Sequence, residues 1–191
     1  MPPRLVLASA SPRRAQILTS LRIPFRVVVS HVDETIGPEE DGAVAAERLA
    51  RKKAKAVAGS EDLPVLAADT VVVCEGQVLG KPVSPEDAAR MLRMLSARRH
   101  EVVTGVCLVT GGAVRSGIER TSVSFASMTD EQVGWYVATG EPMDKAGAYH
   151  VDGIGSAFIA SLSGSPSNVA GLPVRLVLRL AREAGLALGP P

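Results

Sequence analysis

The stretch Val65–Cys74, which reads VLAADTVVVC, is an almost continuous apolar run that only Asp69 and Thr70 interrupt. Such a run is typical of a strand that is buried on both faces of a sheet. A Glu-Gly pair follows it and indicates a turn into a second strand over 77–80. A carboxylate inside a buried strand needs a partner, because an unpaired buried charge is costly. A metal ion, a lysine or a reacting water would each be a suitable partner; the alternative is a structural aspartate whose hydrogen bonds are satisfied.

Short β-branched runs alternate with segments of helical period along the rest of the chain, which predicts an α/β fold, mixed α+β, with helices around a sheet. We expect further strands at 5–8, 25–29, 102–109, 114–125 and 157–162. We expect helices at 12–21, 43–58, 85–96, 130–140 and from Pro173 onward, with a loop at 163–171. Gly111 and Gly112 predict a hairpin, and Trp135 and Tyr136 are expected to lie in the core.

The composition excludes several classes of protein. The chain has 191 residues, of which 46% are hydrophobic and 21% charged, and its formal net charge is +1. This suffices for one domain, or two small lobes that share a core, and excludes a disordered chain. The near-zero charge and the scarcity of aromatic residues argue against a nucleic-acid-binding surface. Two cysteines, no signal-peptide core and no apolar stretch of membrane-spanning length lead us to expect a soluble, cytoplasmic protein without a membrane partner.

The helix expected at 43–58 carries a lysine where a charge is unfavourable. At about 100° per residue, Ala46, Leu49, Ala50 and Val57 form one apolar stripe, and Lys53 falls in the middle of it. An ammonium there needs an anionic partner. The alternative is that the aliphatic stem of Lys53 follows the helix to its edge, so that the charge reaches solvent.

The start of the first helix gathers groups that bind anions. Ser9 closes a strand, Ser11 stands at the N-cap position, and Pro12 is the first helical residue. Arg13 and Arg14 follow, one turn ahead of apolar residues, so both should flank the side that faces the core. Free amides, hydroxyls and guanidinium groups at a helix N-terminus predict an anion site. The alternative is an ordinary helix cap, and the sequence has no P-loop motif.

Three further residues extend the predicted phosphate and metal site. Lys81 precedes a proline that holds it extended at a strand end, and Asp33 and Glu34 lie in the loop after the second strand. The alternative is that the two acids are ordinary solvated loop residues, and a Lys-Pro pair alone carries little information. Lysines, arginines and a helix N-terminus match a polyphosphate, while carboxylates match Mg²⁺ or Mn²⁺. With Asp69 to orient or deprotonate water, the set predicts hydrolysis of a nucleotide-like phosphoanhydride.

Seven segments in this order resemble the Maf-like nucleoside triphosphate pyrophosphatases, over about residues 5–173. They are LASASPRR at the start, VDE at 32–34, RLARKKA around Lys53, AADT at Asp69, LGKP at Lys81, EPMDKAGAY at 141–149 and SNVAGLP at 167–173. The resemblance implies a single Maf-like domain over residues 1–191, an elongated mixed sheet flanked by helices, and two lobes with a central cleft. It also implies a homodimer that uses a divalent metal cation, Mg²⁺ or Mn²⁺.

The activity that the resemblance implies is the hydrolysis of unwanted nucleoside triphosphates to the monophosphate and pyrophosphate, by metal-assisted attack of water at the α-phosphorus. Asp69 would accept the proton and, with Glu34, help to bind the metal. Lys53 and Lys81 would hold phosphates.

The resemblance also bears on substrate choice. Arg13 and Thr70 would influence it, and the SPRR and ADT motifs are similar to those of the branch that hydrolyses dTTP and UTP. That branch carries a glutamine where this sequence has Asp152, a carboxylate that only accepts hydrogen bonds when ionised. A different base preference, such as 7-methyl-GTP or another modified nucleotide, is therefore an alternative, as is a regulator that binds nucleotides without catalysis.

Overall fold

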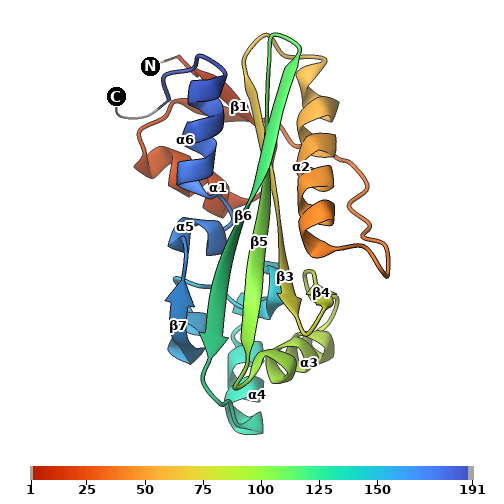
Figure 1. Cartoon of the computed structure of the whole chain (residues 1–191). Coiled ribbons are helices and arrows are strands. Elements are labelled where there is room, and N and C mark those ends of the chain that lie inside the picture. Colours follow the sequence, from red (N-terminus) through yellow and green to blue (C-terminus); the bar gives the residue numbers. More distant parts are fainter. Residues whose placement is uncertain (1, 189–191) are drawn as a thin grey trace. The chain divides into compact units, whose positions relative to one another are not determined.

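The computed structural model describes residues 2–188 and has the mixed α/β fold expected from the sequence (Figure 1). Seven strands form one mixed sheet in the order β2-β1-β3-β5-β6-β7, with β4 paired to β3. The strands are β1 (Leu5–Leu7), β2 (Phe25–Val27), β3 (Val65–Cys74), β4 (Gln77–Leu79), β5 (Arg99–Thr110), β6 (Ala113–Phe125) and β7 (Ile159–Ser163). β1 is parallel to β2 and β3, whereas β4 and β7 are antiparallel to their partners β3 and β6.

Six α-helices and three 3-10 helices accompany the sheet in the described residues. The α-helices are α1 (Pro12–Ser20), α2 (Gly42–Ala58), α3 (Pro85–Leu95), α4 (Asp130–Ala138), α5 (Pro166–Val169) and α6 (Val174–Glu183). The 3-10 helices are η1 (Glu141–Asp144), η2 (Ala146–Ala148) and η3 (Ile154–Phe158). No helix within residues 2–188 is long and apolar enough to cross a membrane.

Most expected elements are present, and the differences have simple causes. The segment 163–171 was expected to be a loop, but it contains α5, a single turn that Ser165 caps by accepting a hydrogen bond from the N–H of Asn168. Trp135 was expected in the core and is 57% exposed, because its neighbour Tyr136 takes the inward position on α4. The hairpin is confirmed: Gly111 and Gly112 both have positive φ, as a two-residue turn between β5 and β6 requires.

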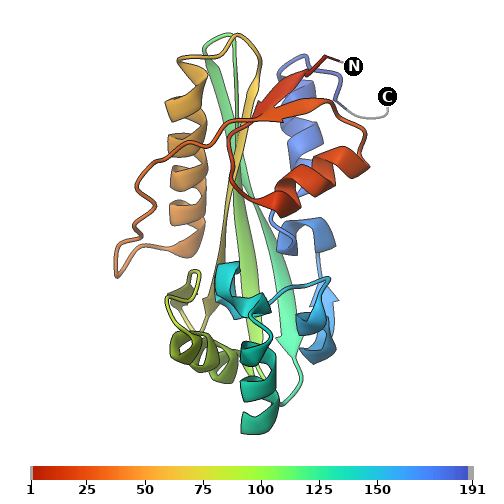
Figure 2. The same ribbon diagram turned by 180° about the vertical axis from the view of Figure 1, so that it is seen from behind.

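The chain divides into two compact units, and the division falls inside β3, β5 and β6. Among the described residues, the first unit comprises 2–69, 104–119 and 171–188. In this unit α2 lies on one side of the strands and α1 and α6 lie on the other (Figures 1 and 2). The strands supply a different set of side chains to each side, because successive residues of a strand point to opposite faces.

The core of the first unit follows this alternation. Residues of β1, β3 and β5 that face α2 pack with apolar side chains of that helix: Val6, Ala8, Val65, Ala67, Cys107 and Val109 with Ala50, Ala54 and Val57. The intervening residues pack with α1 and α6: Leu5, Leu7, Leu66, Ala68, Val106 and Leu108 with Leu18, Leu176, Val177 and Leu180. Helix α2 lies so close to β5 that a Cβ on Gly105 would come within 2.3 Å of the backbone oxygen of Ala46.

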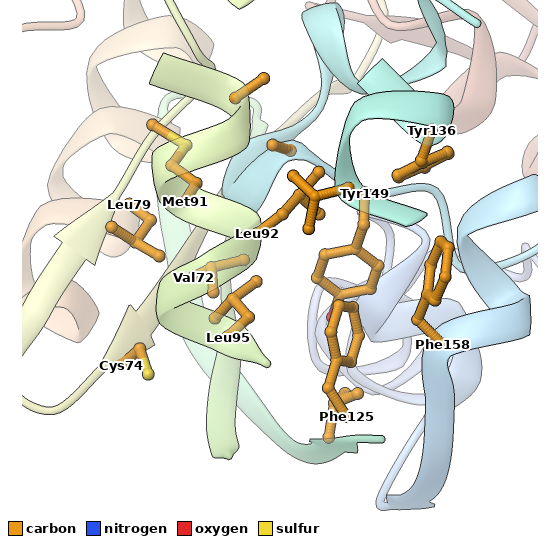
Figure 3. Packing of buried hydrophobic residues seen from close by; sticks show 14 of the residues in the cluster. Val72, Cys74, Leu79, Met91, Leu92, Leu95, Phe125, Tyr136, Tyr149 and Phe158 are labelled. Atoms are coloured by element: carbon orange, nitrogen blue, oxygen red, sulfur yellow. The ribbon is translucent and has the colours of Figure 1, made fainter. Parts of the chain in front are cut away.

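The second unit comprises residues 70–103 and 120–170. Its core lies between α3, α4 and the strands; Leu92 and Leu95 of α3 approach Val72, beside the rings of Phe125 and Tyr149 (Figure 3). These two rings stack edge-to-face with centroids 4.8 Å apart, and His100 packs against both. The aromatic residues of the second unit are therefore used largely for packing.

Candidate active site

Asp69 lies on the face of β3 that is turned toward α2. Val65 and Ala67 already face this helix, and the alternation of the strand gives Asp69 the same direction. The Nζ atom of Lys53, on α2, donates a hydrogen bond to Oδ1 of Asp69 over 2.6 Å. The two residues are only 6% and 7% exposed. The prediction that Lys53 turns inward to meet an anion is confirmed, and the alternative of a stem that carries its charge to solvent is wrong.

A second carboxylate approaches the same ammonium. Oε2 of Glu34 lies 2.7 Å from Nζ of Lys53, and the side chain of Glu34 is 52% exposed. One buried cation thus lies between an interior carboxylate and one that reaches solvent. Glu34 and Asp69 thus both contact the ammonium of Lys53.

The segment between β2 and α2 runs alongside α2 (Figure 2), and basic residues of that helix bind the part of it that carries Glu34. Lys52 donates to the backbone oxygen of Asp33 over 2.7 Å, and Arg48 donates to that of Thr35 over 3.1 Å. Arg48 also forms two hydrogen bonds of 2.7 Å with Glu40. At about 100° per residue, Arg48 and Lys52 lie on the side of α2 opposite its apolar stripe, so helical periodicity alone indicates solvent for both. Because they are four residues apart, the two side chains lie on the same side of the helix. Only the path of the loop shows what they bind.

Asp33 has a local structural task. Its Oδ1 accepts hydrogen bonds from the N–H and the hydroxyl of Thr35 over 3.0 and 2.6 Å, which is an Asx-type turn. The hydrogen bonds from Thr35 lower the pKa of Asp33. The suggestion that Asp33 joins Glu34 and Asp69 around a metal is therefore not supported, since Asp33 shapes the loop that presents Glu34.

Arg14 joins the start of α1 to the segment before α6. Its Nε donates to the backbone oxygen of Gly171 over 2.7 Å and its Nη1 to Oγ of Ser9 over 3.2 Å. Burial lowers the pKa of Arg14, and the negative charges of Asp69 and Glu34 oppose that shift. Arg14 is thus close enough to sense both carboxylates while it holds Ser9 in place.

Ser11 and Arg13 lie where the sequence predicted them. Ser11 is the N-cap residue of α1, but its side chain makes no capping hydrogen bond, and its N–H donates to Oγ of Ser9 over 3.1 Å. Arg13 is half-buried, and burial lowers its pKa. The simple reading of this segment as an ordinary side-chain cap is wrong, because the Ser11 hydroxyl is not used for that purpose.

Thr70, Lys81 and Asp152 belong to the second unit. Thr70 follows Asp69 directly in β3, so its side chain is on the opposite face of the strand. Lys81 and Asp152 are both exposed. In the first unit the structure brings together Ser9, Arg14, Glu34, Lys53 and Asp69.

The donor set of the first unit fits a magnesium-like ion. Mg²⁺ is commonly bound by one or two carboxylates and by phosphate oxygens of the substrate, without a cage made only of protein ligands. Glu34 and Asp69 supply two such carboxylates, and both of them contact Nζ of Lys53. No group of three or more His, Cys, Asp or Glu side chains that could hold a metal occurs among residues 2–188. The residues therefore suit a cation that arrives with an anionic substrate.

An interior carboxylate, a buried lysine and an arginine-braced helix start are thus grouped in the first unit of a mixed α/β protein. The chain belongs to the Maf-like family, since the family described as Maf-like protein matches residues 4–184. A dTTP/UTP pyrophosphatase of Anaeromyxobacter dehalogenans (strain 2CP-C) is 50% identical over 98% of this chain and 97% of the relative. Another, from Moorella thermoacetica, is 51% identical over 96% of each.

A solved structure supports the fold. The Ham1 protein of Staphylococcus aureus superposes with a TM-score of 0.51 over 95% of this chain and 98% of that chain, at 16% sequence identity. The resemblance drawn from the seven sequence segments is thereby confirmed at the level of family and fold.

Proposed function

We propose that this protein hydrolyses nucleoside triphosphates, with dTTP and UTP as preferred substrates, to the nucleoside monophosphate and pyrophosphate. The observation that carries the proposal is the buried contact between Lys53 and Asp69, with Glu34 on the same ammonium. A regulator that only binds nucleotides has no need of an interior carboxylate at that place. The relatives with about half of their residues identical to this chain are named dTTP/UTP pyrophosphatases.

The proposed reaction consumes one water. The water oxygen forms a bond to the α-phosphorus, the bond between that phosphorus and the oxygen bridging to the β-phosphorus breaks, and pyrophosphate leaves. The proton of the water passes to the carboxylate of Asp69, which acts as the general base. Lys53 fixes the direction of this carboxylate by its 2.6 Å hydrogen bond to Oδ1, and Oδ2 would accept the proton of the water.

As the bond to the α-phosphorus breaks, negative charge develops on the oxygens of the leaving pyrophosphate. Fixed positive groups stabilise that charge. In the first unit, Arg13, Lys53 and the N-terminus of α1 would supply them, with Ser9 and Ser11 as hydroxyl partners. Arg14 would act mainly by holding Ser9, because two of its donors are occupied within the protein.

A divalent cation, Mg²⁺ or Mn²⁺, held by Glu34 and Asp69 would neutralise phosphate charge and polarise the reacting oxygens. In the second unit, the family resemblance assigns Lys81 to phosphates, Thr70 to substrate choice and Asp152 to the base. We further expect a cytoplasmic protein that forms a homodimer, and analytical ultracentrifugation of the purified protein would test the dimer.

The direct test is to incubate the purified protein and Mg²⁺ with dTTP, UTP, GTP and 7-methyl-GTP and to identify the phosphate product. Pyrophosphate from dTTP and UTP supports the proposal, and a chelator should abolish it until Mg²⁺ or Mn²⁺ is restored. Release of orthophosphate alone, or binding without turnover, would contradict it. A preference for 7-methyl-GTP would retain the reaction and overturn the substrate.

Asp69→Asn removes the proton acceptor and keeps the shape of the side chain. We expect kcat to fall by about 10²–10⁴-fold, the usual contribution of a general base. Asp62→Asn is the matched control, because Asp62 is exposed in the loop before β3. Asp152→Gln, measured as kcat/KM across the same nucleotides, tests the assignment of the base-recognising position.

A further inference from the structure

Glu141 lies at the centre of a hydrogen-bond network in the second unit. Its Oε1 accepts hydrogen bonds from the hydroxyl of Tyr136 over 2.8 Å and from the N–H of Gly155 over 2.9 Å. Its Oε2 accepts one from the N–H of Ile154 over 3.1 Å and lies 3.6 Å from Nδ1 of His150. Both carboxylate oxygens therefore contact residues of the segment 150–155, and Oε1 also accepts a hydrogen bond from α4.

Tyr136 extends the same network. Its side chain is fully buried, and its hydroxyl accepts a hydrogen bond from the N–H of His150 over 3.1 Å while it donates to Glu141. The loop 150–155 is thus bound by Glu141 and Tyr136 at three backbone N–H groups, two at its end and one at its start. Asp152 stands in the middle of this loop.

The backbone of the loop approaches the two side chains closely at two glycines. A Cβ on Gly153 would lie 2.3 Å from Oε2 of Glu141, and a Cβ on Gly155 would lie 2.5 Å from the hydroxyl oxygen of Tyr136. A Cβ on Gly155 would also lie 2.9 Å from the backbone N and O of His150, so a side chain there would displace the loop, whereas one at Gly153 would displace the carboxylate of Glu141. The geometry is that of a loop fitted closely around one carboxylate.

The network also fixes the charge of Glu141. Burial raises the pKa of this carboxyl, but the hydrogen bonds from Gly155, Tyr136 and Ile154 outweigh burial and bring the pKa below its ordinary value. Glu141 is therefore ionised at neutral pH and accepts hydrogen bonds at both oxygens. A neutral amide in its place would turn one acceptor into a donor that faces the N–H of the loop.

We propose that Glu141 is a positioning residue for base selection, because it fixes the loop that carries Asp152. This inference rests on the proposed function, in which Asp152 contacts the base. The consequence is that base preference depends on a carboxylate that does not itself touch the nucleotide.

The quantity to measure is the selectivity ratio, kcat/KM for dTTP divided by kcat/KM for dGTP. The free energy of a hydrogen bond to a charged group corresponds to a change of about tenfold or more in an equilibrium or a rate ratio. We expect Glu141→Gln to lower the ratio by about tenfold through KM for dTTP, while kcat at saturating dTTP stays within about twofold. Glu131→Gln, on the exposed surface of α4, is the matched control and should leave the ratio unchanged.

A double-mutant cycle distinguishes positioning from a general loss of structure. In the Asp152→Ala background, where the positioned side chain is absent, Glu141→Gln should produce no further change in the ratio. A fall as large as in the wild-type background would overturn the proposal. So would an equal loss of kcat/KM for both nucleotides.

Tyr136→Phe provides a second variant in case Glu141→Gln fails to fold. It keeps the ring that packs against Phe158 and removes the hydroxyl that links His150 to Glu141. Hydrogen exchange of the peptide spanning 150–155 should accelerate in both variants, and unchanged exchange would overturn the proposal. A wild-type protein that releases no pyrophosphate would defeat the proposed function itself, whereas an active, selective enzyme with an additive cycle would defeat only the role of Glu141.

Discussion

Nζ of Lys53 and Oδ1 of Asp69 are 2.6 Å apart, and both side chains are buried in the first unit. The contact joins the middle of α2 to the middle of β3. Each residue alone would be an unfavourable charge in an apolar stretch, and each offsets part of the cost of burying the other. The pair is therefore a structural element of the core as well as the candidate catalytic group.

Lys53→Met should reduce both stability and activity. Methionine keeps the length of the stem but leaves Asp69 buried without its cation, which costs about 3–5 kcal/mol in the free energy of unfolding. Urea unfolding measures this, and Lys55→Met is the control because Lys55 is exposed on the same helix. Equal stability of the two variants would show that Asp69 does not depend on Lys53.

Arg14→Lys should weaken the start of α1. The guanidinium contacts Ser9 and Gly171 with two different nitrogens, whereas an ammonium is a single point that does not span both. We expect a loss of about 1–3 kcal/mol in the free energy of unfolding, measured with urea. Arg4→Lys, at an exposed position, should change it little. An Arg14→Lys variant as stable as the Arg4→Lys control would contradict the bracing role.

Two glycine substitutions should change the free energy of unfolding in opposite directions. Gly105→Ala would place a Cβ 2.3 Å from the backbone of Ala46, so α2 must move away from β5, and overpacking of this kind costs about 1–3 kcal/mol. Gly134→Ala, on the exposed side of α4, meets nothing within 4 Å and should stabilise the protein by about 0.5–1 kcal/mol. Thermal unfolding of both variants checks the contrast, and a stabilised Gly105→Ala variant would refute the close approach.

His100 should make stability fall in mild acid. Burial lowers its pKa from 6.5 to about 4. Between these values the unfolded chain binds more protons than the folded one, so the free energy of unfolding decreases as pH falls from 6.5 toward 4, by at most about 3 kcal/mol. The measurement is the difference between wild type and His100→Gln in urea unfolding at about pH 7, 6, 5 and 4, which spans the titration of the imidazole.

Other acids also titrate in that range, so the test is the change in this difference with pH. It should shrink as the pH falls, because the variant has no imidazole to protonate. His31→Gln is the control, since His31 is exposed. A difference that stays constant across the whole range would mean that His100 does not titrate as its burial requires.

The sequence predicted the elements whose pattern is local. β3 has the expected ends at Val65 and Cys74, and helical spacing placed Lys53 in the apolar stripe, although it left open whether the ammonium turns inward or reaches solvent. The error at Trp135 arose because two adjacent aromatic residues on a helix cannot both point to the same core. Hydrophobicity alone does not say which of the two is inside.

Contacts between distant segments were beyond reach. The approach of Glu34 to Lys53 depends on a loop that Arg48 and Lys52 hold, and no periodicity records such a contact. The same is true of Glu141, whose N–H partners Ile154 and Gly155 lie 13 and 14 residues further along the chain. The resemblance to a family indicated that these segments matter, but only the folded structure shows which of them are in contact.

The place of Asp69 in β3 also limits how this gene can vary. A single codon inserted or deleted between Val65 and Ala68 would shift the carboxylate by one position and turn it toward α1 and α6, leaving Lys53 opposite a neighbouring residue. Exchange of one apolar residue for another in this strand is a mild change by comparison. Indels in this short stretch should therefore be rejected far more strongly than replacements.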